Sequence, residues 1–179
     1  MKRLVTFTIL ALMLAAASAT AQLGATTGTT TLSVAVVAEA GLTVNTSTTT
    51  LASTGTSFST YTGTTNLTYY VRTSPTSGNG LITLKVTTDF APTGGPSVAT
   101  PPSAGDKLTY SPTVSSPGTA STGPLTASTV SQTNVGTFGA GAHSALAGNS
   151  ASVAWSLSND PQYAVGTYTA TVTFTISAA

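Results

Sequence analysis

The chain of 179 residues contains no cysteine and very little charge. Only five residues are Lys or Arg, four are Asp or Glu, and a single residue is His. The absence of cysteine excludes disulfides, iron–sulfur clusters and thiol chemistry, so the fold has to rest on its core and on backbone hydrogen bonds. The small number of bases excludes the positive surface that nucleic-acid binding requires.

Groups that could carry out acid–base catalysis are equally scarce. His143 lies in the small-residue stretch GAGAHSALAG, and no Asp or Glu lies within sixteen residues of it along the chain. General acid–base catalysis needs titratable groups that are held close together. Asp89, Asp106 and Asp160 are isolated in turn-rich segments and do not form a calcium-loop pattern. We therefore expect no enzyme activity, no cofactor and no metal, and we interpret His143 as an exposed loop residue.

The first residues have the three parts of a bacterial export signal. A basic start at Lys2 and Arg3 precedes a mostly apolar run, which ends before the small-residue site Ala19-Thr20-Ala21. We predict a signal peptide over residues 1–21. The alternative is a membrane anchor, but the apolar run is shorter than the roughly 20 residues that a spanning helix needs.

The expected mature chain, residues 22–179, carries three bases and four acids. We expect this part to enter no membrane after signal cleavage. Its expected location is the periplasm, the cell surface or the medium outside a bacterium.

Ser and Thr are abundant, with 62 residues together, and many of them alternate with apolar residues. The terminal stretch GTYTATVTFTISAA has Thr or Ser at every odd position from Thr167 to Ser177. A β-strand sends successive side chains to opposite faces, so this alternation predicts a strand with one buried and one wet face. One solvated face is typical of antiparallel sheets.

Similar alternation recurs along the chain, and turn-rich segments separate the alternating runs. We predict an all-β fold, an immunoglobulin-like β-sandwich of about seven antiparallel strands, with a small β-barrel as the alternative. The predicted domain covers residues 32–179 and follows a flexible arm over residues 22–31. Residues 67–90 are expected to form one hairpin, and residues 151–177 another.

One face of each of the strongest alternating runs consists of large apolar residues, which we expect to be buried. These residues are Leu67, Tyr69, Val71, Ile82, Leu84, Val86, Val153, Trp155, Leu157, Tyr168, Val172, Phe174 and Ile176.

Tyr70 lies on the opposite face from Tyr69 and Val71, so we expect its ring to be exposed. An exposed aromatic ring is typical of sites that stack on sugar rings. Tyr70 is therefore the candidate contact if the partner is a cell-surface glycan.

The two ends of the mature chain share a layout with a known group of proteins. An alternating segment, TLSVAVVAEAGLTV, stands near the N-terminus, and the last strand carries Gly166, Tyr168, Ala170, Val172 and Phe174 at every second position. This layout resembles the spore-coat-U and archaic chaperone–usher pilin domains, whose last strand typically reads Gly-x-Tyr-x-Asp/Ala-x-Val-x-Val. Those pilins usually carry a disulfide near the first strand, and this chain has no cysteine.

The resemblance implies a sandwich that lacks one strand and receives it from another subunit by β-strand addition. The apolar residues of the exchanged strand would be Leu32, Val34, Val36, Leu42 and Val44. The acceptor edge would contain Tyr168, Val172, Phe174 and Ile176. The alternative is a closed sandwich, in which the terminal strand pairs with residues 151–157 and with another strand of the same chain.

These observations predict an exported structural protein of a bacterial cell surface, filament or extracellular matrix, with other copies of itself as the partner. A carbohydrate- or surface-binding adhesin module is the alternative.

Overall fold

The computed structural model describes residues 27–179. The predicted signal peptide and residues 22–26 of the predicted arm lie outside the described residues. Residues up to Val34 and residues Ala35–Ala179 form separate units, and the second unit contains every strand. No helix in residues 27–179 is long and apolar enough to cross a membrane.

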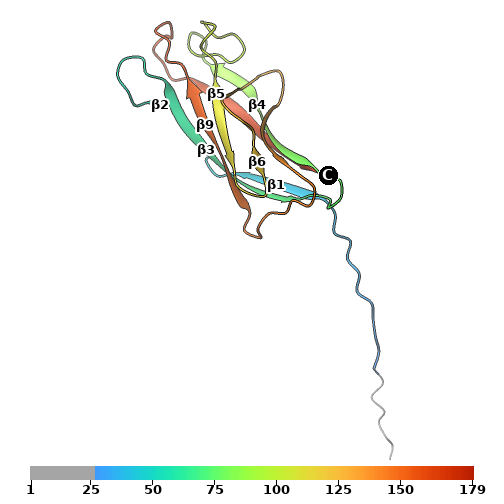
Figure 1. Ribbon diagram of the computed structural model, residues 1–179. Coiled ribbons are helices and arrows are strands. Elements are labelled where there is room, and N and C mark those ends of the chain that lie inside the picture. Colours follow the sequence, from blue (N-terminus) through green and yellow to red (C-terminus); the bar gives the residue numbers. More distant parts are fainter. Residues whose placement is uncertain (1–26) are drawn as a thin grey trace, which may run out of the picture. The chain divides into compact units, whose positions relative to one another are not determined.

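Two antiparallel sheets pack face to face as a sandwich (Figure 1). One sheet has the order β1-β3-β9-β5-β7, with β2 also paired to β3, and the other has the order β10-β4-β8-β6. The seven longer strands are β1 (Glu39–Val44), β3 (Tyr61–Arg72), β4 (Gly80–Ala91), β5 (Thr109–Val114), β8 (Thr133–Phe138), β9 (Asn149–Leu157) and β10 (Thr169–Ala178). The three two-residue strands are β2 (Ala52–Ser53), β6 (Thr119–Ala120) and β7 (Leu125–Thr126). The predicted all-β sandwich of about seven antiparallel strands is confirmed, and the chain does not form a closed barrel.

The core lies between the inner faces of the two sheets, where alternate residues of β3, β4 and β9 meet. The predicted core residues on these three strands are each at most 5 % exposed: Leu67, Tyr69, Val71, Ile82, Leu84, Val86, Val153, Trp155 and Leu157. The Trp155 ring packs against Tyr110, with 5.7 Å between ring centroids. Its Nε1–H donates a hydrogen bond of 2.8 Å to the hydroxyl of the buried Thr65, so the polar atom of this large side chain is satisfied.

The prediction of full burial is wrong for the terminal strand and the residue before it. Val172, Phe174 and Ile176 face the core but are only half-buried, and Tyr168, just before β10, is half-buried as well. The reason is position, since β10 is the edge strand of its sheet and has a strand neighbour on one side only. Ile82 and Leu84 lie on the adjacent β4, which has neighbours on both sides, and they are fully buried.

Both predicted hairpins are wrong, because the chain crosses between the sheets at each of these connections. β3 belongs to the six-stranded sheet and β4 to the four-stranded sheet, and β9 and β10 are divided in the same way. Alternation of side chains reports which face of a strand is buried, but it carries no information on which strand lies alongside.

The first strand begins later than predicted. β1 starts at Glu39 rather than at Leu32, and residues 27–38 form neither helix nor strand. Gly41 does not interrupt β1, which pairs with β3 without a break from Glu39 to Val44.

Removal of the Trp155 side chain should destabilise the sandwich more than any change on β10. We expect Trp155→Ala to lower the free energy of unfolding by about 3–5 kcal/mol, because it leaves a large buried cavity. Phe174→Ala should cost clearly less, since Phe174 is only half-buried. Urea unfolding monitored by far-ultraviolet circular dichroism, which does not need the tryptophan signal, measures both free energies. A loss of stability for Phe174→Ala that equals or exceeds the loss for Trp155→Ala would contradict the burial described here.

Candidate functional site

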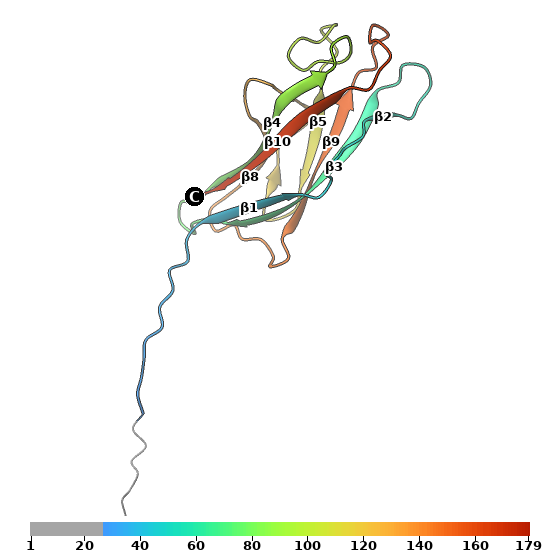
Figure 2. The same ribbon diagram turned by 180° about the vertical axis from the view of Figure 1, so that it is seen from behind.

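The two longest sheet edges of the sandwich lie on the same side of it. β10 pairs only with β4, and β1 pairs only with β3. The outer strands on the other side, β6 and β7, have two residues each. β1 and β10 run next to each other across the gap between the sheets, with Cα atoms approaching within 8 Å (Figure 2). The unpaired N–H and C=O groups of a long edge strand can pair with a strand of another chain.

The inner face of β10 is covered incompletely along this side. Val172, Phe174 and Ile176 pack on the core with one flank, and each remains partly open to solvent. On the facing edge, Leu42 of β1 is also half-buried and packs on the same core. An additional strand beside β10 would cover this apolar row and pair with the free edge.

The residues of the predicted exchanged strand fall into two groups. Leu42 and Val44 belong to β1 and pair with Tyr69 and Leu67 of β3 in the same chain. The other three, Leu32, Val34 and Val36, lie in the strand-free segment before β1 and are 91 %, 85 % and 64 % exposed. The segment before β1 that forms no strand is therefore residues 27–38, and its Val37 carbonyl accepts a hydrogen bond from Arg72.

Tyr168 plays a different part from the one predicted for it. Its ring lies against Gly95, where a Cβ atom would come within 2.3 Å of the ring, and its hydroxyl donates to the Ala164 carbonyl at 2.7 Å. Tyr168 precedes β10 and anchors two loops to each other. The proposed acceptor row is thus reduced to Val172, Phe174 and Ile176.

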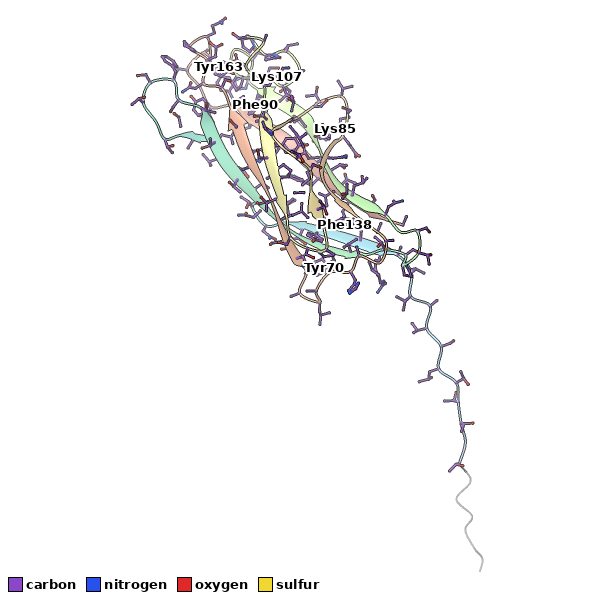
Figure 3. The ribbon with its side chains drawn as sticks, viewed as in Figure 1. Tyr70, Lys85, Phe90, Lys107, Phe138 and Tyr163 are labelled. Carbon is purple, nitrogen blue, oxygen red and sulfur yellow. The ribbon has the colours of Figure 1, made fainter. Side chains whose placement is uncertain are left out.

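Tyr70 lies at the opposite end of the sandwich from Tyr163 (Figure 3). It borders a surface hollow of about 530 Å³. The ring is 41 % exposed, as expected from the alternation. Four further polar side chains line the same hollow, namely Glu39, Arg72, His143 and Ser144. No sequence pattern brought these residues together, because Glu39 and His143 are 104 positions apart and only strand pairing makes them neighbours.

A pair of carboxyl groups joins the loops at the end of the sandwich that Tyr163 and Lys107 mark in Figure 3. Asp106 is buried, and the Ser103 hydroxyl donates to Asp160 at 2.7 Å. Burial, together with the neighbouring Asp160, raises the pKa of Asp106. The hydrogen bonds from Ser103 and from the Gln162 N–H lower the pKa of Asp160.

Tyr163 completes this cluster. Burial and the charges of Asp106 and Asp160 raise the pKa of Tyr163 to about 12, so its phenol stays neutral at physiological pH. Among residues 27–179, no group of three or more potential metal ligands exists, and the pair of carboxyl groups reads as a loop junction.

Asp89 organises the loop that follows β4. Its carboxylate accepts hydrogen bonds from the Val98 and Ala99 N–H groups at 2.8 and 3.0 Å, and from the Ser97 hydroxyl at 2.7 Å. Burial opposes ionisation of Asp89, but these bonds together with the one from the Phe90 N–H outweigh it and lower the pKa.

Comparison of this chain with protein-family models, with curated proteins and with solved structures finds no match.

The same substitution should have opposite effects on stability at Asp106, which is buried in a loop, and at Asp89, which is half-buried near the end of β4. A raised pKa means that ionisation of Asp106 costs stability as the pH rises above its ordinary pKa, so Asp106→Asn should stabilise the fold at pH 7 and gain little at pH 3. A lowered pKa means that Asp89 stabilises the fold above its ordinary pKa, so Asp89→Asn should cost roughly 1–3 kcal/mol at pH 7 and less at pH 3. Urea unfolding at the two pH values measures both effects.

Each variant serves as the control for the other, since both replace an aspartate carboxylate by the isosteric amide. Destabilisation by Asp106→Asn at pH 7, or a pH-independent cost of Asp89→Asn, would contradict the respective assignment.

Proposed function

We propose that this protein is a non-enzymatic structural subunit that is exported by a bacterium and assembles with copies of itself by β-strand addition. The assembly would be a filament or matrix at the cell surface or outside the cell. Residues 27–38 of one subunit would supply the strand, and the outer edge of β10 in the next subunit would accept it.

The strand order carries this proposal. The six-stranded sheet contains the succession β1-β3-β9-β5, which is the A-B-E-D order of an immunoglobulin-type sandwich. In the facing sheet of such a sandwich, strand F pairs with C on one edge and with G on the other. Here β4 and β10 stand at the places of C and F, while no strand of residues 27–179 pairs with the other edge of β10. A strand from another chain, placed beside β10 at the position of strand G, would complete this sheet.

The segment before β1 has the length and the periodicity of such a strand. Its twelve residues, 27–38, would span about 40 Å when extended, whereas the ten residues of β10 span about 33 Å. Leu32, Val34 and Val36 share one face of an extended strand. This apolar row would cover the half-buried residues of β10, while the strand's backbone groups would pair with the free edge.

The direction of the chain favours a second copy as the acceptor. Glu39 begins β1 opposite Arg72, and Ser74 donates a backbone hydrogen bond to Ala179, so β1 starts at the end of the sandwich where the chain terminates. A segment that precedes Glu39 would have to reverse its direction to run along β10 of its own subunit. Residues 30–38, TTLSVAVVA, contain no Gly, Pro, Asn or Asp that would form such a turn.

A single charge on the apolar row should abolish assembly. We expect Val34→Asp to weaken self-association at least tenfold, because the added strand would then bury a carboxylate against the core. Ser33→Asp adds the same charge to the opposite face of the strand, so it should leave assembly intact. Size-exclusion chromatography with light scattering measures the mass of the multimers. Repeating the measurement after heating in detergent shows whether the multimers resist dissociation.

Deletion of residues 22–38 provides a second test, because it leaves β1 and the whole sandwich in place. The shortened protein should be a folded monomer that binds a peptide of residues 22–38. A monomeric full-length protein at high micromolar concentration, or equal effects of the charges at positions 33 and 34, would overturn the proposal.

A further inference from the structure

We propose that the hollow beside Tyr70 binds an uncharged saccharide. This site goes beyond the structural function proposed above and does not depend on strand exchange, because all of its residues belong to one sandwich. The hollow has three walls, formed by the start of β1, the end of β3 and residues 143–146. Its volume of about 530 Å³ lies within the range of small-molecule sites.

The Tyr70 ring is held in place although it is exposed. Gly41 is its cross-strand partner on β1, and a Cβ atom there would lie 3.8 Å from the ring. On the other flank, a Cβ atom at Gly148 would come within 2.9 Å of the ring, and Gly148 has a φ of +80° that favours glycine. The hydroxyl donates to the Ala147 carbonyl at 3.3 Å. Gly148 therefore allows the backbone to close on one flank of the ring, whereas a side chain at position 41 would only reach ordinary contact with it. The Gly148 flank and the hydroxyl bond pre-organise the ring as a platform.

The charged groups of the hollow are linked to each other and to the backbone. Glu39 and Arg72 are cross-strand partners and form an ion pair of 2.9 Å, and the Arg72 Nε–H donates to the Val37 carbonyl at 2.8 Å. Their side chains are 74 % and 45 % exposed, and an ion pair this exposed contributes little to stability. Its planar groups retain hydrogen-bonding atoms that face solvent, so they remain available to a ligand.

His143 adds a third polar group. Its Nδ1 lies 2.9 Å from the Gly141 carbonyl oxygen, and since a carbonyl only accepts, Nδ1 is the donor. This bond orients the ring and leaves Nε2 as its second hydrogen-bonding atom. The part of the chain after the predicted signal peptide has only seven charged residues and one His, and three of these eight side chains meet in this hollow.

The combination of these groups selects the class of ligand. The opposite charges of Glu39 and Arg72 cancel, which disfavours a strongly anionic or cationic ligand. An aromatic platform surrounded by fixed donors and acceptors matches a molecule that has an apolar ring face and a rim of hydroxyl groups. A neutral sugar residue at the end or side of a glycan has this chemistry.

The experiment is an array of neutral and acidic oligosaccharides probed with the full mature protein, followed by calorimetric titration of the best neutral binder. We expect Tyr70→Ala to weaken binding at least about tenfold, because the platform is lost. Glu39→Gln keeps the shape of the side chain but unbalances the charge, and it should weaken binding to a smaller extent. Val34→Asp, the assembly variant, should bind as tightly as the unchanged protein.

Phe58→Ala is the matched control. Phe58 is also an exposed aromatic residue, at 60 %, but it lies before the start of β3 whereas Tyr70 lies near the end of this strand. Its removal should leave binding unchanged. The proposal would be overturned if the protein bound no neutral glycan or preferred acidic glycans. It would also be overturned if Phe58→Ala and Tyr70→Ala lowered the affinity equally. Glu39→Gln provides a test that does not depend on the fold of Tyr70→Ala. If a folded Glu39→Gln variant binds the glycan with unchanged affinity, the ion pair has no role in binding.

Discussion

The free edge of β10 is the constraint on which the rest of the structure depends. Backbone N–H and C=O groups need partners, and a ten-residue edge leaves a row of them without a strand neighbour within residues 27–179. The same edge leaves the inward side chains of β10 half-covered, although they complete the core. In the proposed assembly, a further strand would pair with this edge and cover these side chains.

Because the chain has no cysteine and few charged residues, its stability depends on core packing and on hydrogen bonds in the loops. Trp155 and Tyr69 fill the space between the sheets, and each has a hydrogen bond for its polar atom, Tyr69 through its hydroxyl to the Ser115 carbonyl. The loops use the few carboxylates as junctions. Asp89 accepts hydrogen bonds from the N–H groups of one loop, and Ser103 links the other two loops by donating its N–H to Asp106 and its hydroxyl to Asp160.

The two proposed interaction sites use different physical means, and each suits its place. Along β10 the offered groups are backbone edges and a row of apolar side chains, which recognise an extended strand of matching periodicity. Beside Tyr70 the offered groups are a fixed ring and paired charges, which recognise a small polar ring. The acceptor edge of β10 and the lining of the hollow use different residues, but the Val37 carbonyl, which accepts the Arg72 hydrogen bond beside the hollow, belongs to the proposed donor segment.

The sequence by itself determined the class of fold and the inward face of each central strand. Alternation in β3, β4 and β9 identified Tyr69, Leu84 and Trp155 as core residues, and it placed Tyr70 outside, because side-chain direction in a strand is a local property. Only the tertiary structure decided which strands are neighbours. The predicted hairpins failed and the burial of Phe174 was overestimated, because pairing depends on where each loop leads the chain and not on the strand itself. For the same reason Glu39, Arg72 and His143, far apart in the sequence, became visible as one site only after β1, β3 and the loop before β9 were aligned.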